Sequence, residues 1–350
     1  MAQRVTNVLK FIVFVGLGFG ILYLVYRNQQ AAYAADCALR GVPESECSLL
    51  DKVWRDFQGA NFGWLGMTLV AFCVSNLSRA IRWNMLLRTL GKQPRLINAF
   101  LTINLGYFAN LGFPRLGELV RPAAMARYEN LKVERVIGTV VVERVIDVIM
   151  LLSLTGLALL LAGDRLLTWL RKNADLSGRL GGLEWWLATA ALLGLGGLAL
   201  AWFQRERIRA TRVGSKLESI LLGFIDGLKT IATVGRPWLF VLHTLNIWLM
   251  YFLMTLFVFK AYAPTAGLNP EAALVTFISG GWGIVVPSPG GMGSYHYLAQ
   301  TALGLYGVAG EDAFSWANIS FFSINIGCNV LIGLLALLLL PRINRSYHPA

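Results

Sequence analysis

Six long apolar stretches constrain what this chain can fold into more than any other feature. A helix needs roughly 20 apolar residues to cross the hydrocarbon core of a bilayer. Runs of about that length occupy residues 8–26, 60–86, 136–162, 185–203, 237–262 and 314–340. Of the 350 residues, 56% are hydrophobic and only 14% are charged, whereas soluble domains carry about 25% charged residues. The sequence therefore predicts an all-α polytopic membrane protein with six transmembrane helices, and it excludes an ordinary soluble globular protein.

Two further apolar stretches, 96–128 and 272–309, are broken in the middle. The first contains Gly112-Phe113-Pro114, and the second contains Pro287-Ser288-Pro289-Gly290-Gly291. Because each half is too short to cross the membrane, we expect two re-entrant helical hairpins. The alternative is that proline and glycine only kink ordinary spanning helices, which membranes tolerate.

The distribution of basic residues predicts the orientation, because Lys and Arg collect in cytoplasmic loops. With the N-terminus inside, the cytoplasmic segments hold 21 of the 31 Lys and Arg residues and the outer segments hold 9. The net charge of +12 is then a membrane-orientation signal and not a sign of nucleic-acid binding, and both termini face the cytoplasm. Segment 204–236 combines basic residues with apolar ones at helical spacing, which predicts a cytoplasmic interfacial helix. A cleavable signal peptide is the alternative for the first span.

The two halves of the chain repeat one order of elements: span, span, broken hairpin, span. The first repeat, residues 1–175, holds spans 8–26, 60–86 and 136–162 with hairpin 96–128, and the second, residues 176–350, holds spans 185–203, 237–262 and 314–340 with hairpin 272–309. Because three crossings separate the copies, the second should be inverted, with the hairpins entering from opposite sides. Paired interrupted segments in inverted halves indicate a transport site near the midplane.

Charged residues follow the first break. Arg115, Glu118 and Arg121 recur at a spacing of three, which places them on one helical face. Arginine is well suited to phosphate, which it can bind through two parallel hydrogen bonds. A cytoplasmic rim of basic residues, partly neutralised by Glu118, is the alternative interpretation.

Three charges also lie inside the next span. Glu143, Arg144 and Asp147 are roughly 10 to 16 Å into the helix, where charges are costly unless they pair or line a cavity. Two acids and one Arg leave one negative charge, for which Arg115 or Arg121 is the natural partner. The other arginine would then be available to a ligand phosphate. A purely structural ion network is the alternative.

The second hairpin predicts an anion site at a half-helix beginning near Ser294. Glycines at its turn let backbone N–H groups approach a ligand, Ser294 can cap the half-helix, and a helix N-terminus favours an anion. A plain tight turn, or a histidine satisfied between helices, are the alternatives. The candidate ligand-binding residues of this hairpin are Ser288, Gly290, Gly291, Gly293, Ser294 and His296.

Other residues carry weaker predictions. Arg79 and Arg82, beside Trp83, are secondary candidates for drawing headgroups in, although interfacial anchoring is the commoner explanation. Cys37 and Cys47 lie in an outer loop, where a disulfide is expected to be permitted. The spacing of the four cysteines supports no metal or redox site, so no metal and no cofactor are expected.

Three motifs together resemble a known family. They are the runs Arg115–Arg121, Val142–Asp147 and Pro287–Gly293, and they look like the flippase-like membrane region at the front of lysylphosphatidylglycerol synthases. Arg82-Trp83, followed by Leu86-Leu87 and Gly91, is similar too. The resemblance covers nearly the whole chain.

The resemblance implies a bacterial cytoplasmic (inner) membrane protein that moves or presents a lipid. Its motif residues would surround the path of a phospholipid or polyprenyl-type lipid. The chain ends soon after its last span, so the aminoacyl-transferring activity of the synthases is not expected here, and Tyr295-His296 stand where many members have an acid. The sequence thus predicts a lipid translocase. The alternatives are a membrane-embedded transferase, or a scaffold for a partner lipid-modifying enzyme; a homodimer is a further expectation.

Overall fold

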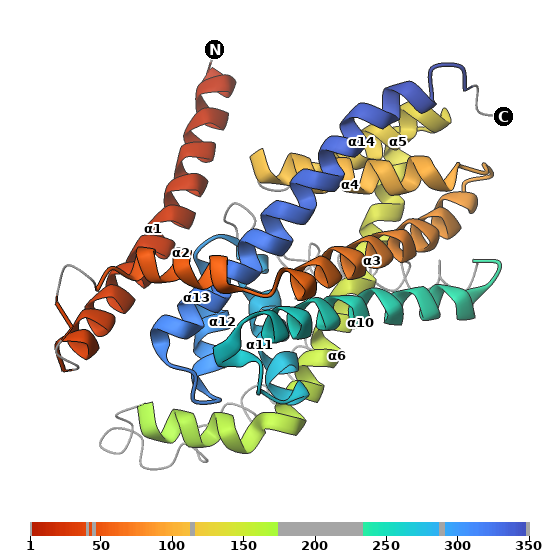
Figure 1. Ribbon diagram of the computed structural model, residues 1–350. Coiled ribbons are helices and arrows are strands. Elements are labelled where there is room, and N and C mark those ends of the chain that lie inside the picture. The colour runs from red at the N-terminus through yellow and green to blue at the C-terminus, as the bar shows by residue number, and fades with distance from the viewer. Residues whose placement is uncertain are drawn as a thin grey trace, which may run out of the picture.

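The computed structural model describes residues 2–39, 42–43, 47–112, 116–173, 234–286 and 291–347, with the backbone alone for 2–18, 36, 167 and 169–173. These residues form helices joined by turns, without strands (Figure 1). In chain order the elements are α1 (Ala2–Leu39), α2 (Leu49–Gly59), α3 (Phe62–Arg88), α4 (Leu96–Gly112), α5 (Gly117–Glu129), α6 (Val133–Asn173), α10 (Pro237–Ala261), η2 (Ala263–Thr265), α11 (Pro270–Val285), α12 (Ser294–Gly304), α13 (Gly310–Ser320), the π-helical η4 (Phe321–Cys328) and α14 (Asn329–Ile343).

Four helices in the described part are long and apolar enough to cross a membrane. They cover Phe62–Arg88, Val133–Leu166, Pro237–Ala261 and Gly310–Ile343, and they coincide with four of the six predicted spans. The predicted span 8–26 lies within α1. The predicted span 185–203 lies outside the described residues, as does nearly all of the interfacial segment 204–236.

The two helices α3 and α10 pack side by side in opposite directions (Figure 1). The backbone N–H of Asn61, before α3, donates to the carbonyl of Ala261 at the end of α10 (2.8 Å). Towards the other end of the pair, the Asn246 amide donates to Ser78 Oγ (2.7 Å). The start of each helix therefore lies by the end of the other.

Two helical hairpins, α4–α5 and α11–α12, open at opposite ends of α6. Glu129, which ends α5 directly before α6, accepts a hydrogen bond from the backbone N–H of Arg95, just before α4 (3.0 Å). At the other hairpin, Tyr306 donates to Glu271 at the start of α11 (2.9 Å), and Glu271 pairs with Arg165 in the last third of α6 (3.2 Å). The two hairpin bases thus lie at the two ends of this helix.

The tips of both hairpins reach the middle of α6. Glu118, near the tip of the first hairpin, pairs with Arg144 (3.1 Å). Trp282, near the tip of the second, donates its indole N–H to Thr155 Oγ1 (3.0 Å). The partners of the two hairpins on α6 are therefore eleven residues apart, roughly 16 Å along the helix at 1.5 Å per residue.

Glycines allow the two arms of each hairpin to approach closely. A Cβ on Gly117 would overlap the backbone carbonyl of Gly106 on the opposite arm. In the second hairpin, a Cβ on Gly283 would lie 2.7 Å from Tyr295 Cα and 2.9 Å from the Ser294 carbonyl oxygen. Larger residues at these positions would separate the arms.

Each hairpin packs against the last long helix of the other half of the chain. The first arm α4 lies along α14, where Leu101 meets Ala336 and Leu340. The first arm α11 of the second hairpin lies along α6, where a Cβ on Gly281 would be in ordinary contact with Leu151, 3.6 Å away. The two halves are consequently interlocked.

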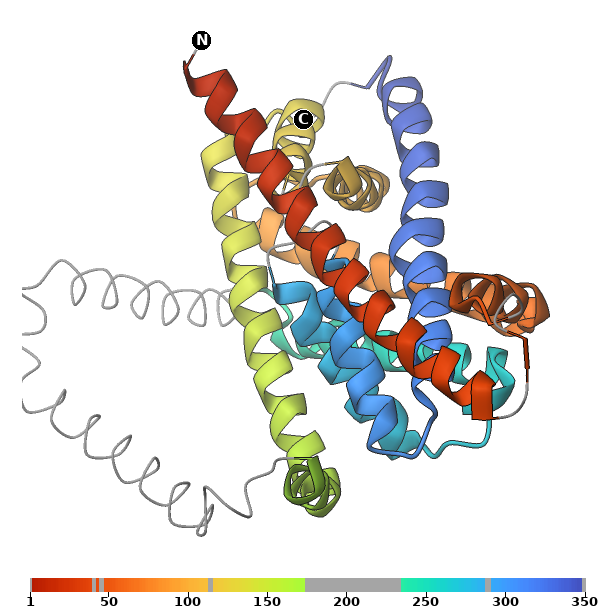
Figure 2. The same ribbon diagram turned by 90° about the vertical axis from the view of Figure 1, so that its left-hand side faces the viewer.

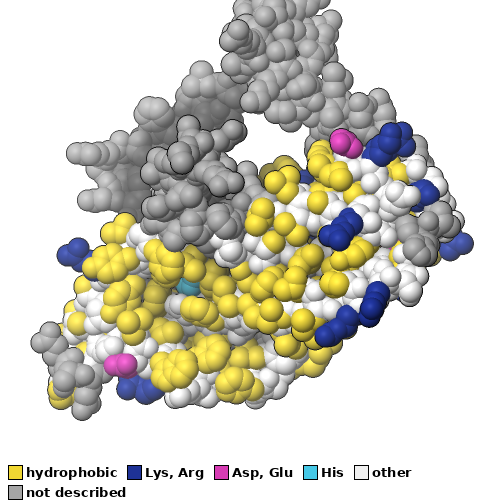
Figure 3. All heavy atoms as spheres, turned by 90° about the horizontal axis from the view of Figure 1, so that it is seen from above, with side chains coloured by type: hydrophobic (Ala, Val, Ile, Leu, Met, Phe, Trp, Pro, Cys, Tyr) yellow, Lys and Arg dark blue, Asp and Glu magenta, His cyan; other side chains and the backbone are white. Residues whose placement is uncertain are grey.

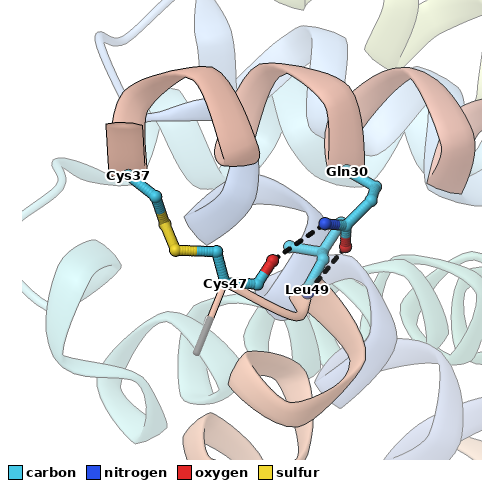
Figure 4. The surroundings of a disulfide bond; sticks show 4 residues. All are labelled: Gln30, Cys37, Cys47 and Leu49. Atoms are coloured by element: carbon cyan, nitrogen blue, oxygen red, sulfur yellow. Dashed lines mark hydrogen bonds between the residues drawn. A yellow bond between two sulfur atoms is a disulfide. The ribbon is translucent and has the colours of Figure 1, made fainter. Parts of the chain in front are cut away.

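The loop between α1 and α2 is closed by a disulfide between Cys37 and Cys47 (Figure 4). Gln30 on α1 donates to the carbonyl of Cys47 and accepts from the backbone N–H of Leu49, both at 2.8 Å. The covalent bond and the two hydrogen bonds fix α2 against α1.

The outer surface is strongly apolar. Figure 3 shows a broad hydrophobic area on one face, with Lys and Arg mainly towards its margins. Many leucines of the long helices are half exposed or more, including Leu160, Leu245 and Leu338. A surface of this kind is suited to lipid and not to water.

Candidate functional site

Five buried charged side chains from three helices form one cluster, which we call the arginine cluster. Helix α3 supplies Arg79 and Arg82, α5 supplies Arg121, and α6 supplies Glu143 and Asp147. The spacing of three in α3 and of four in α6 places each pair on one helical face. The cluster lies beside the first half of α6, next to Arg144, which the first hairpin contacts through Glu118.

The ion pairs of the arginine cluster form a continuous chain. Arg79 Nη1 lies 3.0 Å from Asp147 Oδ2, and Arg82 Nη2 lies 3.0 Å from the other oxygen of Asp147. Arg82 Nη2 is also 3.3 Å from Glu143 Oε1, while Arg121 Nη2 is 2.6 Å from Glu143 Oε2. Each carboxylate is therefore shared by two guanidinium groups.

Helix α10 completes the hydrogen bonds of the arginines. Arg82 Nη1 donates to Thr244 Oγ1 (3.2 Å), and Arg79 Nη2 donates to the Tyr251 hydroxyl (3.0 Å). The Arg121 guanidinium lies over the ring of Trp83, 3.8 Å from its centroid, a geometry that adds cation–π attraction. Residues of both halves of the chain thus hold the cluster.

The arginine cluster is almost fully removed from solvent. Arg82 is 0% exposed and Glu143 is 1% exposed, and the Asp147 side chain is 14% exposed. Buried charges require partners, because desolvation of each ion costs several kcal/mol. Here the described part of the cluster sets three guanidinium groups against two carboxylates, which leaves an excess of one positive charge.

The arginines also keep unused hydrogen-bond donors. The Nε atoms of Arg79, Arg82 and Arg121 are buried and have no hydrogen-bond partner among the described residues. A buried donor without an acceptor is unfavourable by about 1–3 kcal/mol, and by more when the group is charged. The excess charge and the free donors together favour an anionic ligand oxygen.

The predicted role of Arg144 is wrong. We expected Arg144 to compensate Glu143 and Asp147, leaving one negative charge. Arg144 instead pairs with Glu118 away from the cluster, and both side chains are about half exposed, at 52% and 43%. Glu143 points about 100° away from Arg144 around the helix axis, and the Asp147 carboxylate is already held by Arg79 and Arg82.

The first break itself lies only partly in the described residues. Phe113, Pro114 and Arg115 fall outside them. Arg121 is the predicted partner from this hairpin that the structure brings to Glu143.

The second hairpin has a different N-terminal geometry from the predicted one. Ser294 does not cap α12, because its hydroxyl donates to the carbonyls of Gly283 (2.6 Å) and Gly291 (3.1 Å). Gly293 occupies the cap position, and its backbone N–H donates to His296 Nδ1 (3.4 Å). The half-helix ends at Gly304.

Glycine is required at the turn of this hairpin. Gly291 and Gly293 have φ angles of +80° and +84°, a conformation that other residues rarely adopt. Ser288 and Gly290 lie outside the described residues. His296 is buried against the ring of Phe321, 4.8 Å between centroids, in the core of the second half and not in the arginine cluster.

A comparison with protein families matches residues 48–333 to the family described as Lysylphosphatidylglycerol synthase TM region. The match covers more than three quarters of the 350 residues. The chain belongs to this family. It is accordingly a multi-pass membrane protein of a family connected with lipid biosynthesis or translocation. No curated protein and no solved structure matches the chain.

The sequence gives only weak signals for several residues of the arginine cluster. Arg79 and Arg82 have the pattern of interfacial anchors, but both are buried within the cluster. No local pattern marks Thr244 or Tyr251. The available signal was the polar face of the 60–86 span, where Ser75, Asn76 and Ser78 precede Arg79 and Arg82.

The charges of the arginine cluster suit an anionic ligand better than a metal cation. Both carboxylates are occupied by arginines. Within the described residues, no three His, Cys, Asp or Glu side chains come together as metal ligands would.

Proposed function

We propose that the protein is an integral membrane lipid translocase that binds an anionic lipid headgroup at the arginine cluster. The observation that carries the proposal is the buried excess of one guanidinium, with free Nε–H donors on three arginines. A phosphate oxygen supplies both the missing negative charge and the missing acceptors. The lipid tails would remain in the bilayer.

An inverted repeat would supply the alternating access that such transport needs. Three features support it: α3 and α10 are antiparallel, the hairpins open at opposite ends of α6, and each hairpin packs on the last span of the other half. The close-packed pairs Gly106/Gly117 and Gly283/Ser294 also correspond, with an offset of 177 residues in both members. Two re-entrant hairpins that enter from opposite sides agree with these contacts.

We propose that the protein lies in the bacterial inner membrane. Both of its termini would face the cytoplasm. Figures 1 and 2 place the start of α1 and the end of α14 at the same end of the molecule, which supports two termini on one side of the membrane. The excess of Lys and Arg in the predicted inner segments favours the cytoplasmic side.

The test is mass spectrometry of the lipids retained by the gently purified protein. Arg121→Gln removes the excess charge, whereas Arg121→Lys keeps it, and Arg88→Gln changes an exposed arginine at the end of α3 as a matched control. We expect wild type, Arg121→Lys and Arg88→Gln to retain anionic phospholipid selectively, and Arg121→Gln to lose this selectivity. Melting temperatures establish that each variant is folded.

An unchanged lipid profile in folded Arg121→Gln would contradict the headgroup site and favour a scaffold. Lipid movement is tested with a fluorescent phosphatidylglycerol in proteoliposomes that contain no second substrate. Movement under these conditions favours a translocase over a transferase.

A further inference from the structure

An apolar groove with a volume of about 440 Å³ lies between α6, α10 and α11. Leu154 and Leu161 line it from α6, Leu249 from α10, and Leu274 from α11. Leu161 and Leu249 are about half exposed, at 55% and 50%, so the groove opens on the apolar outer surface of the molecule.

One end of the groove is polar and lies at the base of the second hairpin. Glu271 lines the groove there, accepts a hydrogen bond from the Tyr306 hydroxyl (2.9 Å) and pairs with Arg165 (3.2 Å). The Arg165 side chain is 53% exposed. This end has the character of a membrane interface, where charged and aromatic residues collect.

The other end of the groove adjoins the arginine cluster. Trp248 lines the groove and packs edge-on against Tyr251, with 5.9 Å between the ring centroids. Tyr251 is in turn the acceptor for Arg79. The Trp248 ring therefore lies between the groove and Tyr251, which accepts a hydrogen bond from Arg79.

The groove also contains a donor without an acceptor. Trp248 is 9% exposed, and its indole N–H has no hydrogen-bond partner among the described residues. Buried tryptophan N–H groups usually find one. The carbonyl oxygen of a lipid ester is an acceptor of the kind that would satisfy it.

The dimensions of the groove suit a hydrocarbon chain. Its lining on α6 runs from Met150 to Leu161, which is roughly 16 Å at 1.5 Å per residue. That length is about half of a hydrocarbon core of ~30 Å. A whole lipid would not fit, but much of one chain would.

The corresponding interface in the other half of the molecule is closed. There α4 packs along α14 with Leu101, Ala336 and Leu340 all buried. A Cβ on Gly333 would overlap the Phe108 side chain, so no space is left between the helices. Among the described residues, the α4–α14 contact is thus closed where the groove between α6, α10 and α11 is open, as expected of a repeat that exposes its two sides in turn.

We propose that this groove is the lateral portal that receives one acyl chain of a glycerophospholipid while the headgroup occupies the arginine cluster. The inference rests on the proposed function and adds the route by which the lipid enters. The bound chain lies along α6, with its ester end by Trp248.

The experiment uses the full chain in proteoliposomes of phosphatidylethanolamine and phosphatidylglycerol, with a phosphatidylglycerol probe carrying a photoreactive diazirine in its acyl chain. Adducts mapped by mass spectrometry should concentrate on the groove residues of α6, α10 and α11. Leu249→Trp and Leu274→Trp fill the groove. Each should lower the adduct yield roughly tenfold, the effect of losing about two buried methylene contacts.

Leu242→Trp is the matched control. It lies on the same helix as Leu249 with nearly the same exposure, 52%, but does not line the groove, and its adduct yield should equal that of wild type. Adducts spread evenly over the lipid-facing helices, or equal yields from Leu249→Trp and Leu242→Trp, would overturn the proposal. A different result would count against the headgroup site alone. In that case the groove residues are still labelled, but Arg121→Gln leaves lipid selectivity unchanged.

Discussion

Arg121 on α5 and Glu143 on α6 fasten the second arm of the first hairpin to the longest described span, with Nη2 2.6 Å from Oε2. Both residues are buried, and Glu143 has a second partner in Arg82. The pair thus connects the hairpin to the arginine cluster. Any rearrangement that moves this arm along α6 must break or exchange it.

A double-mutant cycle measures this connection. Removing one partner of a buried ion pair typically destabilises a protein by roughly 3–5 kcal/mol, so Arg121→Gln should lower the free energy of unfolding by about that amount. The double variant Arg121→Gln/Glu143→Gln should lose less than the sum of the single variants. The measurement is denaturant unfolding in detergent, and strictly additive single effects would show that the two side chains are not coupled.

Arg82→Lys should weaken the selective retention of anionic lipid, although it conserves the charge. Arg82 donates to Thr244, Glu143 and Asp147 at once, and a lysine ammonium is a compact charge without the planar fork that spans these acceptors. Loss of one hydrogen bond to a charged group is worth about 1.5–3 kcal/mol, so selective retention of anionic lipid should drop roughly tenfold or more. Arg88→Lys is the control, and retention equal in both variants would refute this role.

Gly117→Ala should separate the arms of the first hairpin. The added methyl group would overlap the Gly106 carbonyl oxygen, whereas a methyl group on Gly112 would meet nothing within 4 Å. Overpacking of this kind costs about 1–3 kcal/mol or more. The melting temperature of Gly117→Ala should fall clearly below that of Gly112→Ala, and similar melting temperatures would mean that the arms are not in close contact.

A cluster of four polar side chains beside α2 predicts a loss of stability at alkaline pH. Lys52 contacts Asp56 (2.7 Å) and Asp312 (2.6 Å), and the Tyr262 hydroxyl donates to the same two carboxylates. Burial lowers the pKa of Lys52, but the hydrogen bonds that its ammonium donates to Asp312 and Asp56 outweigh burial and raise this pKa overall. Burial, and then the two carboxylate charges, raise the pKa of Tyr262.

Both raised pKa values favour the protonated groups in the folded state. The stability that they contribute is complete below the ordinary pKa values of about 10 and declines as the pH rises above them. Melting temperatures between about pH 8 and pH 11 should therefore fall more steeply in wild type than in Tyr262→Phe, which cannot deprotonate there. Parallel declines would show that Tyr262 does not contribute.

The sequence predicted the apolar helices well because hydropathy alone determines which segments enter a bilayer. It also predicted a partner for Glu143 from the first hairpin, and Arg121 is that partner. The reason was electrostatic: a charge at that depth must be compensated, and only a few residues nearby could do so.

The rest of the cluster depended on packing that no hydropathy pattern contains. Arg79 and Arg82 resemble interfacial anchors because they follow an apolar run and precede Trp83. They are buried because α10 runs antiparallel to α3 and presents Thr244 and Tyr251 to them. The sequence separation within these pairs exceeds 160 residues, so local spacing could not reveal them.

The contact between α4 and α14 also has a consequence for biogenesis. A ribosome releases residues 96–112 long before it has made residues 329–343, and until then Leu101 has no neighbour at Ala336 or Leu340. We expect the nascent first hairpin to remain incompletely packed beside the insertion machinery. Its packing should be completed only when translation reaches the last helix. Truncations near the carboxyl terminus would then be degraded by membrane proteases as readily as truncations near the middle.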